Sequence, residues 1–201
     1  MLKIFTILAM TFTFSAWALP TPEELLIEAN SLDWNDAVTT TIKINAPVSV
    51  VWKYASDSTK ANDWSIYFDH ISPLPGIPDG KIGALRRCFR NKDETGPYWD
   101  EVTTESVPET RRQITTYGLK NFPMNFLSDG QYVFVRQLYK AIDDKTTEMT
   151  FQTRTSPSRT WMGRLAFWFS KGETSRIFLA NLENIKANIE GTPRPHPWEA
   201  D

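Results

Sequence analysis

The sequence predicts an α+β protein in which a curved antiparallel sheet wraps around one long C-terminal helix. Two patterns support this fold class. The segment 160–190 repeats apolar residues at steps of three and four, which is the spacing of a helix with one apolar face. Short segments between residues 38 and 155 alternate apolar and polar residues, which is the spacing of half-buried strands. Because a long apolar stripe must be covered, the helix and the sheet are expected to pack on each other.

The C-terminal helix is predicted over residues 160–190. Gly172 in its interior allows a kink, and Gly191 followed by Pro193 and Pro195 predicts its end. Its apolar stripe contains Ile177, Phe178, Leu182, Ile185 and Ile189.

The strands are expected to follow one another as a meander, because turn residues separate most of them at short intervals. The first strand alternates from Val38 to Ile44, and two short helices after Pro47 separate it from the others. The predicted strands cover residues 38–45, 67–72, 82–90, 97–106, 111–117, 131–141 and 146–155.

Two longer loops interrupt this pattern. The loop over residues 72–83 is rich in proline and glycine. The loop over 118–130 contains several apolar residues, among them Phe122 and Met124. Apolar side chains in a loop need a cover or a ligand, so this second loop is a candidate part of a binding site.

The N-terminal segment has the pattern of a secretory signal peptide. Lys3 provides the positive charge, an apolar stretch follows, and Ala16-Trp17-Ala18 supplies small residues for cleavage after Ala18. The stretch is too short for a good membrane span. We therefore expect a signal peptide over 1–18 and a periplasmic or secreted protein.

The mature chain is expected to have three parts. A helical extension over 19–35 begins with a capping box formed by Thr21 and Glu24, and it is expected to pack outside the main domain. The main domain covers 36–191, and a proline-rich tail covers 192–201.

Composition argues against several functional classes. The formal net charge is −2, which does not predict nucleic-acid binding. With Cys88 as the single cysteine and two histidines, we expect no internal disulfide, no metal site and no cofactor. Basic residues near Trp161 and Trp168 allow contact with a membrane surface, although a solvated face is the simpler interpretation. We expect a monomer.

Several segments resemble, in order and spacing, the START-like helix-grip superfamily, and more narrowly its polyketide cyclase/dehydrase and lipid transport group (SRPBCC). These segments are IKINAPVSVVWKYASDSTKANDW from Ile42, GKIGALRRCF from Gly80, DEV from Asp100, PETRR from Pro108 and NLENIKANIE from Asn181. The resemblance covers about residues 36–190.

The resemblance implies a deep, largely apolar cavity between sheet and helix that holds one small molecule. The abscisic acid receptors of plants are similar in plan, with two gate-like loops over the cavity mouth, and residues 74–80 and 118–128 lie in the corresponding places. The resemblance implies no particular reaction, because the superfamily includes carriers, receptors and cyclases.

Candidate site residues come from two neighbouring strands. Trp99, Glu101 and Thr103 share one face of a predicted strand, and Arg86 and Cys88 share one face of the strand before it. The resemblance directs Arg86, Cys88 and Glu101 toward the interior. The candidate ligand-binding residues are Arg86, Cys88, Trp99, Glu101, Thr103, Phe122, Met124 and Trp168.

The pair Arg86–Glu101 has three possible roles. In a cavity it could hold a carboxylate, a hydroxyl or a carbonyl of a ligand. On the surface it would be an ion pair of small energetic value. If Glu101 were poorly paired, burial would raise its pKa and make it a candidate proton donor or acceptor. His70, beside Asp69 near the expected cavity mouth, is the other weak catalytic candidate.

Three functions follow from these observations. The first, which the sequence favours, is an exported binding protein for an apolar or amphipathic, lipid-like small molecule. The second is an enzyme of the cyclase, dehydratase or isomerase type that uses Glu101 or His70. The third is a protein without a ligand, whose interior is filled by Phe89, Trp99, Phe134, Phe151 and Trp168.

Overall fold

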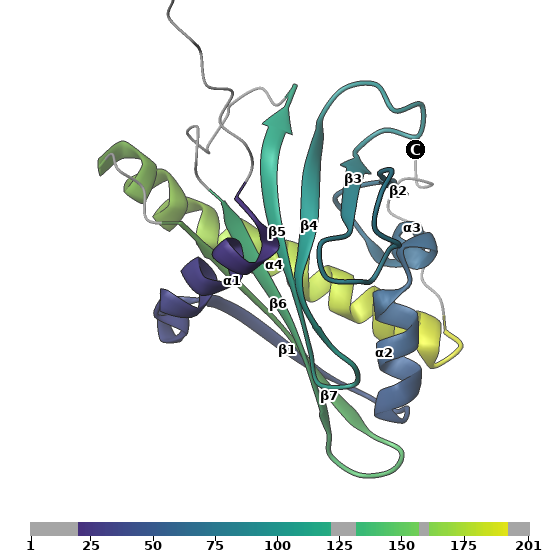
Figure 1. Ribbon diagram of the computed structural model, residues 1–201. Coiled ribbons are helices and arrows are strands. Elements are labelled where there is room, and N and C mark those ends of the chain that lie inside the picture. Colours follow the sequence, from purple (N-terminus) through teal and green to yellow (C-terminus); the bar gives the residue numbers. More distant parts are fainter. Residues whose placement is uncertain (1–19, 122–131, 157–160, 193–201) are drawn as a thin grey trace, which may run out of the picture.

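The computed structural model describes residues 20–121, 132–156 and 161–192, and in the last helix it describes side chains from Ser170 onward. One seven-stranded antiparallel sheet curves around a long C-terminal helix, as Figure 1 shows. The predicted α+β fold class is therefore confirmed.

The strands follow the predicted meander. Their order in the sheet is β1-β7-β6-β5-β4-β3-β2, so that β2 to β7 pair in sequence and β1 adds to β7. The bounds are β1 Val38–Ile44, β2 His70–Pro73, β3 Leu85–Phe89, β4 Tyr98–Val107, β5 Arg111–Lys120, β6 Val133–Ala141 and β7 Thr147–Thr155.

The strand β3 begins three residues later than predicted. Residues 81–84 form a turn in which the Ala84 amide donates to the Lys81 carbonyl at 3.0 Å. Gly83 has a φ of +86°, and a Cβ there would lie 2.8 Å from the Ile77 side chain. Glycine thus permits both the turn and the close approach of the loop before it.

The curvature of the sheet has a local cause. The pairing of β4 with β5 shifts register twice, between Tyr98 and Asp100 and between Thr103 and Glu105. Such bulges bend a strand and increase its twist. The bent strand carries the sheet around the helix and places Trp99, Glu101 and Thr103 on its concave inner face.

The helix α4 (Trp161–Ile189) runs without a break through Gly172, so the kink that the sequence allows does not interrupt it. Leu182 and Ile185 are fully buried against the inner face of the sheet. The helix ends as predicted, because Gly191 has a φ of +73° and the Thr192 amide donates to the Ala187 carbonyl at 2.8 Å.

The short helices α2 (Val48–Ser56) and α3 (Ala61–Trp64), joined by the 3₁₀ helix η2 (Ser58–Lys60), close one end of the sheet, as Figure 1 shows. Side-chain amides of α4 bond to the backbone at and beyond α3. The amide of Asn184 donates to the Trp64 carbonyl at 3.2 Å, and Asn181 accepts from the Ile66 amide at 2.9 Å. These bonds set how α3 docks on α4.

The helix α1 (Pro22–Ser31) lies on the outer face of the sheet, away from α4. The predicted capping box is present, with the Thr21 amide donating to Glu24 at 2.7 Å. The sequence predicts this helix outside the main domain, and in the structure it lies on the face of the sheet opposite α4. It is nevertheless part of the folded unit, because Leu25 packs fully buried against Val102 and Phe134.

The segment after α1 is fastened to the sheet as well. The 3₁₀ helix η1 (Trp34–Asp36) presents the Trp34 ring to the Arg136 guanidinium, 3.7 Å from the ring centre. The same guanidinium donates to Asn30 at 2.6 Å. None of the helices among the described residues is long and apolar enough to span a membrane.

Substitution of a buried side chain in α1 tests whether this helix is packed on the sheet. We expect Leu25→Ala to lower the free energy of unfolding by about 2–5 kcal/mol, because it leaves a cavity in a packed cluster. The matched control is Ile27→Ala in the same helix, where the side chain is 64% exposed and the effect should stay within about 0.5 kcal/mol. Urea unfolding followed by circular dichroism measures both. Equal effects of the two variants would show that α1 does not contribute to the core.

Candidate functional site

The inner face of β3, β4 and β5 brings the predicted polar residues together. The register pairs Arg86 with Glu101 and Cys88 with Trp99, and it pairs Glu101 with Thr116 of β5. Because side chains alternate along a strand, these residues point to the same side of the sheet as α4. The predicted faces of β3 and β4 are therefore correct.

The Arg86–Glu101 pair is buried and densely bonded. Arg86 donates to Glu101 Oε2 from Nε at 2.8 Å and from Nη2 at 2.7 Å. The other carboxylate oxygen, Oε1, accepts from Trp99 Nε1 at 2.9 Å and from the Thr116 hydroxyl at 3.3 Å. Arg86 also donates to the Ser58 hydroxyl of η2 at 3.3 Å. The surface interpretation of this pair is wrong, because the side chains are 7% and 10% exposed.

These contacts determine the charge of Glu101. Burial opposes its ionisation, but the charge of Arg86 and the hydrogen bonds from Trp99 and Arg86 outweigh burial and hold its pKa below the usual range. The sequence argument for Glu101 as an acid/base residue required a poorly paired carboxylate. The structure shows a paired and ionised one, which suits an electrostatic anchor.

A second buried arginine lies beside this pair. Arg112 of β5 is 2% exposed and donates from Nη1 to the Ser56 carbonyl at the end of α2, at 3.3 Å. Its Nε and Nη2 atoms are buried and have no hydrogen-bond partner. Burial and the neighbouring charge of Arg86 lower the pKa of Arg112 to about 10, so it stays charged at neutral pH. We refer to Arg86, Glu101 and Arg112 as the arginine cluster.

Other polar atoms near the cluster are also buried without a partner. Asp79, in the loop between β2 and β3, lies within electrostatic reach of both arginines, and its Oδ1 atom is buried and unbonded. The hydroxyls of Thr103 and Thr40, on the inner faces of β4 and β1, are unbonded as well. The inner face thus combines an apolar surface with several polar groups that lack partners.

The other candidates are distributed as follows. Cys88 is fully buried on the inner face, and burial raises the pKa of its thiol well above the usual value. His70 pairs with Phe89 on the outer face, where its ring stacks at 5.2 Å, and it bonds to Asp69 and Glu94. The structure therefore does not bring His70 to Glu101.

The remaining aromatic and loop candidates divide into three groups. Phe122 and Met124 lie outside the described residues, and so does the side chain of Trp168. Trp99 and Phe151 belong to the inner core, as the filled-interior hypothesis required. Phe89 and Phe134 lie on the outer face, because each alternates with an inward-facing neighbour, so they do not fill the interior.

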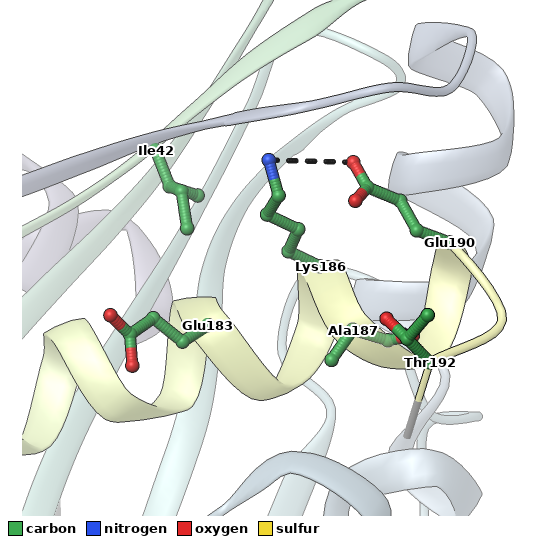
Figure 2. Close-up of a pocket in the computed structure, with 6 residues that line it drawn as sticks. All are labelled: Ile42, Glu183, Lys186, Ala187, Glu190 and Thr192. Carbon is green, nitrogen blue, oxygen red and sulfur yellow. Dashed lines mark hydrogen bonds and ion pairs between the residues drawn. The ribbon is translucent and has the colours of Figure 1, made fainter. Parts of the chain in front are cut away.

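A separate groove of about 290 Å³ lies between β1 and the end of α4, and Figure 2 shows six residues that line it. Lys186 donates to the Lys43 carbonyl at 2.7 Å and pairs with Glu190 at 3.4 Å. Glu190 accepts from the Asn45 amide at 2.7 Å. Lys186 and Glu190 thus fasten the helix end to the edge of the sheet, and the groove contains none of the predicted site residues. Within the described ranges, no cluster of three potential metal ligands occurs.

We compared the chain with protein-family models, curated proteins and solved structures. The sequence matches no protein-family model and no curated protein. Among solved structures, a protein from Thermobifida fusca has a TM-score of 0.59 at 15% identity and covers 80% of this chain and 98% of its own. The Zhui aromatase/cyclase from a Streptomyces species has a TM-score of 0.56 at 13% identity and covers 77% and 93%.

DynU16, from the dynemicin biosynthetic locus, has a TM-score of 0.56 at 18% identity and covers 79% of this chain. This chain spans about half the length of DynU16, because 49% of that chain is covered. At such identities the likeness concerns the fold. The chain has the START-like helix-grip fold, as the sequence resemblance predicted.

Sequence reasoning missed Arg112 and Asp79. Arg112 lies in the predicted strand 111–117, where it precedes Ile114 and Thr116 at the strand period and shares their inward face. That alternation was a usable signal for Arg112. Asp79 lies in an irregular loop, where no periodicity indicates the direction of a side chain.

Removal of the Glu101 charge tests how much the arginine cluster contributes to stability. We expect Glu101→Gln to lower the free energy of unfolding by about 3–5 kcal/mol, because the buried guanidinium of Arg86 then loses the carboxylate to which it is bonded. The control, Asp100→Asn, breaks the half-exposed Arg87–Asp100 pair on the other face of the same hairpin and should cost about 1 kcal/mol or less. Denaturant unfolding at pH 7 gives both values, and a smaller loss for Glu101→Gln than for the control would contradict the assigned role.

The lowered pKa of Glu101 also predicts a dependence on pH. Because its pKa is lower in the folded than in the unfolded protein, its stabilisation is fully present above about pH 4.3 and is lost as the pH falls through the folded-state pKa. The stability gap between wild type and Glu101→Gln should therefore narrow below that pH. Unfolding at a series of pH values from 7 to 3 measures the gap, and a constant gap would rule out this linkage.

Proposed function

We propose that this protein binds one small amphipathic molecule between the inner face of the sheet and α4. The observation that carries the proposal is Arg112, whose Nε and Nη2 groups are buried without a partner on the side of the sheet that faces α4. A buried polar group without a hydrogen bond is destabilising by about 1–3 kcal/mol, and a charged one by more. A ligand that accepts these hydrogen bonds would remove that penalty.

The surroundings of the cluster suit the apolar part of such a molecule. Val135 of β6 pairs with Ile114 on the inner face and is only half-buried, so the middle of this face has accessible apolar surface. Trp99, Phe151 and Met149 are buried in the apolar core on this side of the sheet. A few polar groups in an apolar setting are typical of small-molecule sites.

Binding without catalysis fits the described residues better than an enzyme does. An acid/base mechanism in this space needs a titratable group that is free to exchange a proton. Glu101 is held ionised by four donors, and His70 lies on the other face of the sheet. The likeness to an aromatase/cyclase is a likeness of fold and supplies no reaction for this chain.

We further propose that the ligand is lipid-like and that the protein acts after export as the mature chain from residue 19. The support for export is the signal-peptide pattern of residues 1–18.

The test is native mass spectrometry of the mature protein purified from its own host compartment, followed by extraction of bound material. We expect one apolar or amphipathic passenger per chain. The variant Val135→Phe, which fills the inner face, should lose most of the passenger, whereas Val50→Phe on the exposed side of α2 should retain it. Wild-type protein without a passenger, together with no thermal stabilisation by any of a panel of amphipathic compounds, would refute the proposal.

A further inference from the structure

Among the hydrogen-bonded groups buried on the inner face, the charges do not balance. The arginine cluster contains two guanidinium cations and one carboxylate, which leaves one net positive charge. Both oxygens of Glu101 are occupied by Arg86, Trp99 and Thr116, so this carboxylate forms no hydrogen bond with Arg112. Burial of a cation without a bonded anion is unfavourable.

The unbonded atoms of Arg112 form a specific edge of the guanidinium plane. Nε and Nη2 point the same way, and together they match the two oxygens of a carboxylate. Nη1, on the other edge, is the group that bonds to the Ser56 carbonyl. The available edge is therefore the one that can bind a carboxylate with two parallel hydrogen bonds.

This chain uses the same edge elsewhere for that purpose. In three described places Nε and Nη2 of one arginine hold both oxygens of a carboxylate: Arg87 with Asp100 (2.7 and 2.9 Å), Arg111 with Glu105 (2.7 and 2.5 Å) and Arg176 with Glu173 (2.9 and 2.6 Å). Those pairs lie at exposed or half-exposed positions. Arg112 is the buried counterpart whose carboxylate does not come from the described chain.

Asp79 supplies charge near the cluster without closing this gap. It lies within electrostatic reach of Arg86 and Arg112, and its buried Oδ1 atom bonds to neither. Its loop contains Gly76 and Gly80, both with positive φ, at +131° and +77°. A carboxylate that is near two cations but not bonded to them can be replaced by a better-placed anion.

We propose that the ligand carries an acidic group, a carboxylate or a similarly flat anion, that binds the Nε and Nη2 edge of Arg112 and takes over from Asp79 as the counter-ion of the arginine cluster. The inference rests on the proposed function, since it assigns the polar end of the molecule bound there. A neutral alcohol or ester could accept the hydrogen bonds but would leave Arg112 without a bonded anion, with only the unbonded Asp79 nearby.

The experiment compares each acid with its uncharged methyl ester, using passenger-free mature protein and isothermal titration calorimetry. The pairs are decanoate with methyl decanoate and 2-naphthoate with methyl 2-naphthoate. We expect each acid that binds to do so about tenfold to a hundredfold more tightly than its ester, because a charge-assisted bidentate contact is added. Arg112→Gln should remove this preference by weakening the binding of each acid far more than the binding of its ester.

Two further variants separate recognition from folding. Arg112→Lys keeps the charge without the planar edge and should keep only part of the preference for the acid. Asp79→Asn removes the competing carboxylate and should tighten acid binding without an effect on the esters. The matched control is Arg87→Gln, which removes the same kind of guanidinium edge from the outer face of the hairpin and should change neither affinity.

The outcomes distinguish the two proposals. Equal binding of acids and esters overturns the acidic ligand, and a preference for acids that survives Arg112→Gln overturns its contact with Arg112. In both cases the binding function stands. Extraction of a neutral passenger from wild-type protein has the same meaning. Failure of all probes, together with the absence of a passenger, overturns the binding function and the acidic ligand with it.

Discussion

Two guanidinium groups, those of Arg86 and Arg112, are buried on the inner face of the sheet beside the single carboxylate of Glu101. The surrounding structure is arranged to tolerate this. The Glu101 oxygens take donors from β3, β4 and β5, and η2 and α2 turn the Ser58 hydroxyl and the Ser56 carbonyl toward the arginines. The cluster therefore joins three strands to the helices that close the end of the sheet. One network of bonds serves both the fold and the proposed site, so its members are expected to affect stability and binding together.

Arginines on the two faces of the sheet differ in how fully their guanidinium groups are hydrogen-bonded. On the outer face, Arg87 meets Asp100 through two hydrogen bonds, and Arg136 is shared among Gln113, Asn30 and the Trp34 ring. On the inner face, Arg112 has one bond and two unused donors. Solvent could satisfy a group on the outer face, but it does not reach Arg112, so the missing contacts are energetically meaningful only on the inner side.

Polar side chains also position the long helix. Leu182 and Ile185 bury the apolar face of α4. Asn181 and Asn184 fix how the helix docks, because their side-chain hydrogen bonds with the Ile66 amide and the Trp64 carbonyl form in only one arrangement. The helix-grip architecture shared with the Thermobifida and Streptomyces proteins thus leaves the chemistry of the inner face to individual side chains.

Local periodicity determined much of this protein from its sequence. The alternation of the strands, the Thr21 capping box, the stop at Gly191 and the common face of Trp99, Glu101 and Thr103 all follow from contacts within a few residues. Only the tertiary structure determined which distant residues contact each other, because strand register, bulges and loop paths depend on pairing across the whole sheet. The tertiary structure determined that Glu101 is fully bonded, that Arg112 is not, that Asp79 approaches the cluster and that His70 lies on the other face.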